Sequence, residues 1–62
     1  MNLIIATNEE KNYTLLMRFD EDEKPVKCQP YVVAWHYDSD SDSWAQGHYF
    51  DDIKSAVDFL CK

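Results

Sequence analysis

Hydrophobic and polar positions alternate most clearly in residues 13–19, where every second side chain is Tyr, Leu, Met or Phe. The same period of two returns in residues 31–37 and again in residues 44–50. Successive side chains of a β-strand point to opposite faces of the sheet, so this period predicts three strands. Residues 2–7 form a shorter β-prone segment around Leu-Ile-Ile, which predicts a fourth strand.

The last segment has the period of a helix. Five apolar residues recur there on a single predicted stripe: Ile53, Ala56, Val57, Phe59 and Leu60. Asp51 and Asp52 precede the stripe, and an Asp at the N-cap accepts hydrogen bonds from the free amides of the first turn. We therefore expect a helix over residues 53–61 whose apolar stripe covers one face of the sheet.

Polar links separate the predicted strands. Residues 20–30 begin with four acids and contain Pro25, which cannot donate to a strand ladder, so a loop is expected there. The six residues Asp38–Ser43 form a turn between the last two strands, because Asp and Ser side chains bond nearby backbone groups. Gly47, the only glycine, is expected to face the helix, either at a bulge or where a side chain packs on bare backbone.

The predicted fold class is α+β, a three- to four-stranded antiparallel meander with one C-terminal helix packed on one face. The 62 residues make a single small domain, 1–62, near the size limit for a chain stabilised by burial alone. A deep enzyme cleft would leave too few aromatic side chains for the core. Because one helix covers only one face, the other face is expected to meet solvent, a partner or a second copy.

Charge restricts the class of partner. Twelve acidic residues against six basic ones give a net charge of −6, which repels DNA and RNA. The same charge suits a basic surface of another protein, because complementary potentials steer encounter. The longest apolar run has only a few residues, so no membrane-spanning segment is expected.

Most of the acidic residues lie in the two links. An antiparallel meander places these links at opposite ends of the sheet, roughly 20–25 Å apart at ~3.3 Å per residue. Such a span is comparable to a short run of duplex phosphates, so one interpretation is mimicry of nucleic-acid charge. The alternative is ordinary solvation of loops by acidic side chains. The residues predicted to bind a partner are the loop acids and two flanking aromatic residues: Asp20, Glu21, Asp22, Glu23, Asp38, Asp40, Asp42, Tyr37 and Trp44.

No catalytic residue, cofactor or metal is predicted. Residues 38–44 match the first three ligand positions of an EF-hand loop, but the glycine and the terminal Glu of that loop are missing. The two histidines and two cysteines are too far apart in sequence for the usual zinc spacing, and neither cysteine has a neighbouring base. The absence of a CxxC pair and of a signal-peptide pattern predicts a reduced, cytoplasmic setting. A disulfide between Cys28 and Cys61 is the alternative if the chain is exported.

The stretches Y-V-V-A-W-H-Y-D, S-W-A-Q-G-H-Y-F-D-D and A-V-D-F-L carry a family likeness over about residues 30–60. In them the chain resembles short, mostly uncharacterised proteins of phages and prophages of Gram-positive bacteria. The resemblance implies no catalytic residues. Small acidic phage proteins include anti-CRISPR and other counter-defence inhibitors that occupy nucleic-acid channels. The implied function is therefore non-catalytic inhibition of a host protein with a basic, nucleic-acid-handling surface. The alternative is a small structural module or homodimer.

Overall fold

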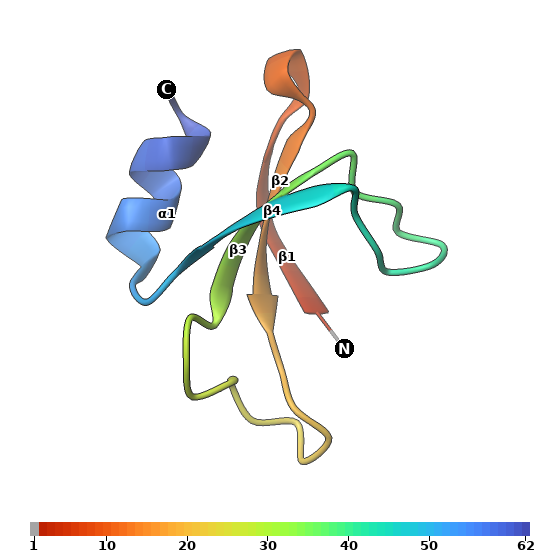
Figure 1. The fold of residues 1–62 in the computed structure, drawn as a ribbon, viewed down its shortest axis with the longest axis vertical. Helices are drawn as coiled ribbons and strands as arrows, with labels where there is room; N and C mark the ends of the chain where they lie inside the picture. The colour runs from red at the N-terminus through yellow and green to blue at the C-terminus, as the bar shows by residue number, and fades with distance from the viewer. Residues whose placement is uncertain (1) are drawn as a thin grey trace.

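The sheet is a meander whose strands follow one another both along the chain and in space (Figure 1). A computed structural model of the chain describes residues 2–62. The strands are β1 (Asn2–Asn8), β2 (Tyr13–Arg18), β3 (Tyr31–Trp35) and β4 (Gln46–Phe50), and each neighbouring pair is antiparallel. A single 3₁₀ turn, η1 (Glu9–Lys11), joins β1 to β2, and helix α1 (Ile53–Leu60) follows β4. The predicted fold class is confirmed, with four strands.

One face of the sheet packs against α1. Leu15 of β2 and Val33 of β3 are fully buried there under Ala56 and Leu60 of the helix. Half-buried residues surround this first cluster: Ala6, Tyr13, Tyr31, Phe50 and Phe59. In Figure 1 the helix stands at one side of the sheet, and it lies against β2, β3 and β4. Burial of both aliphatic and aromatic side chains here supplies the hydrophobic stabilisation that a chain this small needs.

The middle of the helix-free face is also covered, although the sequence led us to expect this face to meet solvent, a partner or a second copy. Leu16, Val32 and Ala34 have no exposed surface. Tyr37 and Trp44, from the link between β3 and β4, pack against them and form a second cluster. The link thus replaces a second helix as the cover of this face.

This link is longer than the predicted turn Asp38–Ser43. β3 ends at Trp35 rather than at residue 37, because His36 takes a left-handed conformation with φ of 56° and its amide donates to Asn12 O at 3.0 Å. Residue 44 was expected to open the last strand, but β4 begins at Gln46. The two residues lost at each strand end give the link the length to fold over the sheet.

Gly47 faces away from the helix, contrary to expectation. A β-carbon added to it would lie 2.7 Å from Trp44 Nε1 and 3.0 Å from Val32 Cγ2, both on the helix-free face. Directly opposed residues of an antiparallel pair share a face, and Gly47 is opposite the buried Ala34. The expectation that a side chain packs on bare backbone at Gly47 is confirmed.

Helix α1 does not present to the sheet the full set of residues predicted from the sequence. Ala56 and Leu60 are buried, whereas Ile53 and Val57 are 45% and 38% exposed. Phe59 takes their place on the sheet side, with its ring centroid 4.5 Å from that of His48. The predicted stripe was therefore wrong at two of its five positions.

Both ends of α1 are held by side chains. Asp52 is the N-cap, as expected from the sequence, and its Oδ2 accepts from the Ser55 amide at 2.9 Å. At the other end Asn8 Nδ2 donates to Leu60 O at 2.7 Å. The second bond satisfies a carbonyl that the helix itself leaves free, and it ties the helix to the end of β1.

Candidate binding surface

The loop after β2 presents the first group of predicted acids in a closed turn. Asp20 Oδ1 accepts from the amides of Asp22 at 2.9 Å and Lys24 at 3.1 Å. Two backbone hydrogen bonds also close the turn: the Asp20 amide donates to Lys24 O at 2.8 Å, and the Glu23 amide donates to Asp20 O at 3.1 Å. Glu23 has a left-handed conformation with φ of 61°. The Asp20 carboxylate therefore organises the turn, while Glu21, Asp22 and Glu23 are exposed around it.

Arg18 fixes the remainder of this loop. Its Nη2 donates to Cys28 O at 3.1 Å and to Gln29 O at 2.7 Å, and its guanidinium carbon lies 4.8 Å from the centroid of the Tyr49 ring. The Gln29 amide also donates to Asp51 Oδ1 at 3.1 Å. Asp51 therefore lies beside the loop that carries the first acidic group, because β4 returns to the same end of the sheet.

The link between β3 and β4 contains the second group of predicted acids. Asp38 and Ser43 form a small bridge, with Asp38 N to Ser43 O at 2.8 Å and Ser43 N to Asp38 O at 3.2 Å. Asp38 Oδ1 accepts from the Asp40 amide at 3.0 Å. Asp38 therefore has the same role here that Asp20 has in the first loop, and Asp40 is exposed at the tip.

Asp42 connects this link to the first strand. Its Oδ1 accepts from Tyr37 Oη at 2.7 Å and from Asn2 Nδ2 at 3.0 Å. These two hydrogen bonds, that from Asn2 first, lower the pKa of the Asp42 carboxyl below its usual value. The bond from Tyr37 to the Asp42 carboxylate is in turn the main reason why the pKa of the Tyr37 phenol is raised.

The contact between Asp42 and Asn2 corrects the predicted separation of the two acidic groups. Asn2 is opposite Arg18 at the end of β2, where the first acidic loop begins. The link was expected at the other end of the sheet, but it folds back across the helix-free face and brings Asp42 to this end. A bipolar arrangement is therefore wrong for Asp42. Figure 1 shows the link leaving the sheet sideways, between the η1 turn and the first acidic loop.

The nine predicted residues divide into two sets. Asp20, Asp38 and Asp42 use their carboxylates to hold the loops in shape. Among residues 2–62, no hydrogen bond engages the carboxylates of four exposed acids: Glu21, Asp22, Glu23 and Asp40. Carboxylates on a preformed loop can accept from Lys and Arg of a partner without a large ordering cost.

Tyr37 and Trp44, predicted as anchors for a partner, are half-buried in the second cluster. Their ring centroids are 6.2 Å apart, and both rings cover the sheet. Most of their apolar surface is therefore used within the fold, and what is left borders the acidic link.

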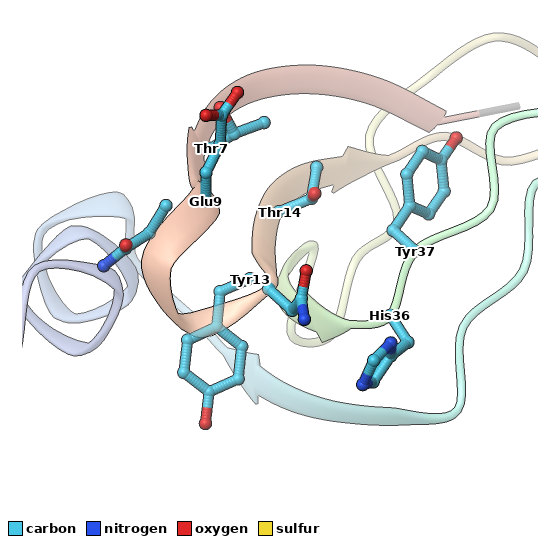
Figure 2. A pocket seen from close by; sticks show the side chains of 8 residues that line it. Thr7, Glu9, Tyr13, Thr14, His36 and Tyr37 are labelled. Carbon is cyan, nitrogen blue, oxygen red and sulfur yellow. The ribbon is translucent and has the colours of Figure 1, made fainter.

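A shallow depression lies between the η1 turn and the start of the link (Figure 2). It has a volume of about 290 Å³. Asn12 and His36, both with positive φ, form part of its wall. Figure 2 shows Glu9 and His36 at opposite sides of it, and Tyr13 pointing away toward the other face. Sequence reasoning missed this hollow, since it depends on His36 leaving the strand. Its polar lining offers hydrogen-bond donors and acceptors.

The described residues 2–62 contain no group of three or more His, Cys, Asp or Glu side chains that could hold a metal ion. His48 contacts Tyr13 and Phe59 instead, and His36 lies against Trp35 with ring centroids 4.0 Å apart. Over the same residues, no helix has the length and apolar character needed to cross a membrane.

No protein-family model, curated protein or solved structure matches this chain. The resemblance to small phage and prophage proteins therefore stays a prediction from the sequence.

Proposed function

We propose that this chain is a non-catalytic acidic binding protein that occupies a basic, nucleic-acid-binding surface of a host protein. The observation that carries the proposal is a group of exposed carboxylates on two loops. Three other carboxylates, those of Asp20, Asp38 and Asp42, hold these loops in shape through hydrogen bonds. The net charge of −6 favours encounter with a basic surface. An inhibitor of the counter-defence type, carried by a phage, is the function that fits these properties.

The position of the link supports this proposal further. Because Asp42 reaches Asn2, the link and the first acidic loop approach the same end of β1 and β2. The proposed contact surface consists of Glu21, Asp22, Glu23 and Asp40, supported from behind by Asp20, Asp38 and Asp42 and bordered by Tyr37 and Trp44. Binding through such a surface needs no catalytic group.

We also propose that the protein acts in the cytoplasm. Cys28 and Cys61 are free thiols and both are exposed. Exposed free thiols persist in a reducing compartment and oxidise readily outside it. The basic surfaces of nucleic-acid-handling proteins lie in the same compartment.

The experiment is affinity capture from a bacterial lysate with the 62-residue chain, followed by direct binding to the captured protein. The test variant combines Glu21→Gln, Asp22→Asn and Asp40→Asn. The control combines Glu9→Gln, Glu10→Gln and Asp58→Asn, which remove the same charge from the η1 turn and the outer helix. We expect the test variant to bind about tenfold more weakly or worse, and the control to change affinity by less than about twofold.

Two further measurements complete the test. Binding of the wild type should weaken by about tenfold or more between low and high salt, and duplex DNA should compete with it. Equal losses for the test variant and the control would indicate a non-specific charge effect and contradict the proposal. So would a captured protein whose binding does not depend on these carboxylates.

A further inference from the structure

The first strand is an edge of the sheet and presents apolar side chains to solvent. β1 has β2 on one side only. Leu3, Ile4 and Ile5 are 54%, 49% and 37% exposed, more together than any other three consecutive side chains of this kind in residues 2–62. The segment Asn2–Asn8 contains no charged residue, in a chain with eighteen of them. Charged side chains and prolines are the usual protection of an edge strand, and β1 has neither.

A bulge divides this edge into two halves. The register with β2 shifts between Ile4 and Ala6, which leaves Ile5 without a direct partner. A bulge bends a strand and interrupts the ladder, so a long strand cannot pair along the whole of β1. Asn2–Ile4 remains a regular half, opposite residues 16–18 of β2. An added strand would therefore pair with about three residues.

A groove accompanies this regular half. It has a volume of about 310 Å³ and is lined by Asn2, Leu3, Phe19 and Glu23. Leu3 is opposite Met17, two positions after the buried Leu15, so it lies on the helix side of the sheet. The helix packs mainly on β2, β3 and β4, and Leu3 in this corner is 54% exposed. The groove therefore offers Leu3 and Phe19 as an apolar floor.

Carboxylates flank the groove on both sides of the strand. Glu23 lines it directly. Asp42 is bonded to the Asn2 side chain, which lies on the opposite face of β1 from Leu3 because neighbouring side chains alternate. An extended segment added beside Asn2–Ile4 would thus meet the apolar floor and Glu23 on the helix side of the strand. On the opposite side it would meet Asp42.

We propose that the Asn2–Ile4 edge and its groove bind an extended segment of the basic partner by strand addition. The segment would place an apolar side chain over Leu3 and Phe19, and cationic side chains toward Glu23 and Asp42. This inference rests on the proposed function and specifies how the partner is held. Backbone hydrogen bonds to the edge supply affinity in such contacts, and alternate side chains supply specificity.

A second copy of the chain fits this edge less well. Antiparallel pairing of Asn2–Ile4 with the same residues of a second copy would bring the Glu23 and Asp42 that flank this half-strand in one copy toward the Glu23 and Asp42 of the other. Like charges placed opposite one another oppose such pairing, and β1 offers no basic residue in compensation. A basic segment at the same edge would instead be attracted by Glu23 and Asp42.

The test uses the full chain and two blocked synthetic peptides of equal charge. One probe is Lys-Val-Lys-Val-Lys, which can form a strand, and the other is Lys-Pro-Lys-Pro-Lys, which lacks two backbone donors and resists pairing. Binding is followed through the backbone amide signals of the isotope-labelled protein at low salt. We expect the valine peptide to shift the amides of Asn2–Ile4 and to bind at least tenfold more tightly than the proline peptide.

Two variants with equal chemistry locate the site. Leu3→Ser removes the groove floor and should weaken binding of the valine peptide by about tenfold. Ile53→Ser removes an apolar side chain of similar exposure, 45% against 54% for Leu3, from the helix and should leave the affinity unchanged. Because both side chains are exposed, both variants are expected to fold, and their amide spectra report this directly.

Equal binding of both peptides, with shifts confined to the acidic loops, would overturn the strand-addition site while leaving the proposed function standing. No binding of either peptide would also overturn it. A dimer in sedimentation with its contact at β1 would show that the occupant is a second copy, which contradicts the proposal as well. The proposed function fails separately, if neutralising Glu21, Asp22 and Asp40 does not affect the captured partner.

Discussion

The indole Nε1 of Trp44 lies 2.7 Å from the point where a β-carbon on Gly47 would stand. The indole therefore rests on bare backbone of β4 and covers Leu16, Val32 and Ala34 from above. This relationship explains both how the middle of the helix-free face is covered and why the only glycine of the chain stands in the middle of a strand. It also gives the acidic link a fixed attachment to the sheet.

Gly47→Ala should destabilise the protein by about 1–3 kcal/mol, because the new methyl group forces the Trp44 ring out of its place and crowds Val32. The free energy of unfolding from urea denaturation measures this. If Trp44 is the obstacle, adding Gly47→Ala to a Trp44→Ala variant should cost clearly less than adding it to the wild type. Equal costs in the two backgrounds would contradict the contact.

Trp44→Ala should itself lower the free energy of unfolding by about 2–4 kcal/mol, since it uncovers the second cluster. Trp35→Ala is the matched control. Trp35 is 37% exposed at the end of β3, and its removal should cost less than about 1.5 kcal/mol. If the two variants were equally stable, the link would not be the cover of this face.

The orientation of α1 predicts a difference between two neighbouring positions on the helix. Leu60→Ala should cost about 2–4 kcal/mol, because Leu60 is only 4% exposed and packs in the first cluster. Val57→Ala should cost less than about 1 kcal/mol, because Val57 is 38% exposed and Ala is the better helix former. Thermal unfolding followed by circular dichroism compares them. A larger loss at Val57 would restore the stripe predicted from the sequence.

The Asp42 hydrogen bonds predict how stability depends on pH. The pKa of Asp42 is lower in the folded state than in the unfolded chain, where it is about 3.9. The stability due to this group is therefore present above that pH and is lost as the pH falls through the folded-state pKa. Denaturation midpoints measured from neutral to acid pH should show the loss.

Asp42→Asn should make that acid-induced loss smaller, since an amide oxygen can still accept from Asn2 and Tyr37 but does not titrate. Asp40→Asn removes the same charge from the same link without touching these hydrogen bonds, and it should leave the loss as steep as in the wild type. If the two variants had the same pH dependence, Asp42 would not be the group responsible.

Much of the fold was predictable from the sequence because it depends on local pattern. The period of two predicted strands over residues 13–19 and 31–37, and the structure has β2 at Tyr13–Arg18 and β3 at Tyr31–Trp35. These strands and the confirmed Asp52 cap each reflect interactions within a few residues. The acidic residues were also found at exposed positions of the loops. The candidate surface was therefore predictable in its composition.

The arrangement of the candidate surface could not be predicted from the sequence, because it depends on contacts between segments distant in the chain. The bond from Asn2 to Asp42 joins residues forty positions apart. The face of Gly47, the burial of Trp44 and the turn of the helix likewise follow from which surfaces need to be covered once the sheet has formed. Sequence alone determined the strands, the helix, the cap and the negative charge, since these follow from short-range periodicity and composition. Only the tertiary structure decided where the link folds and which carboxylates remain free, because burial of the second sheet face is a property of the whole chain.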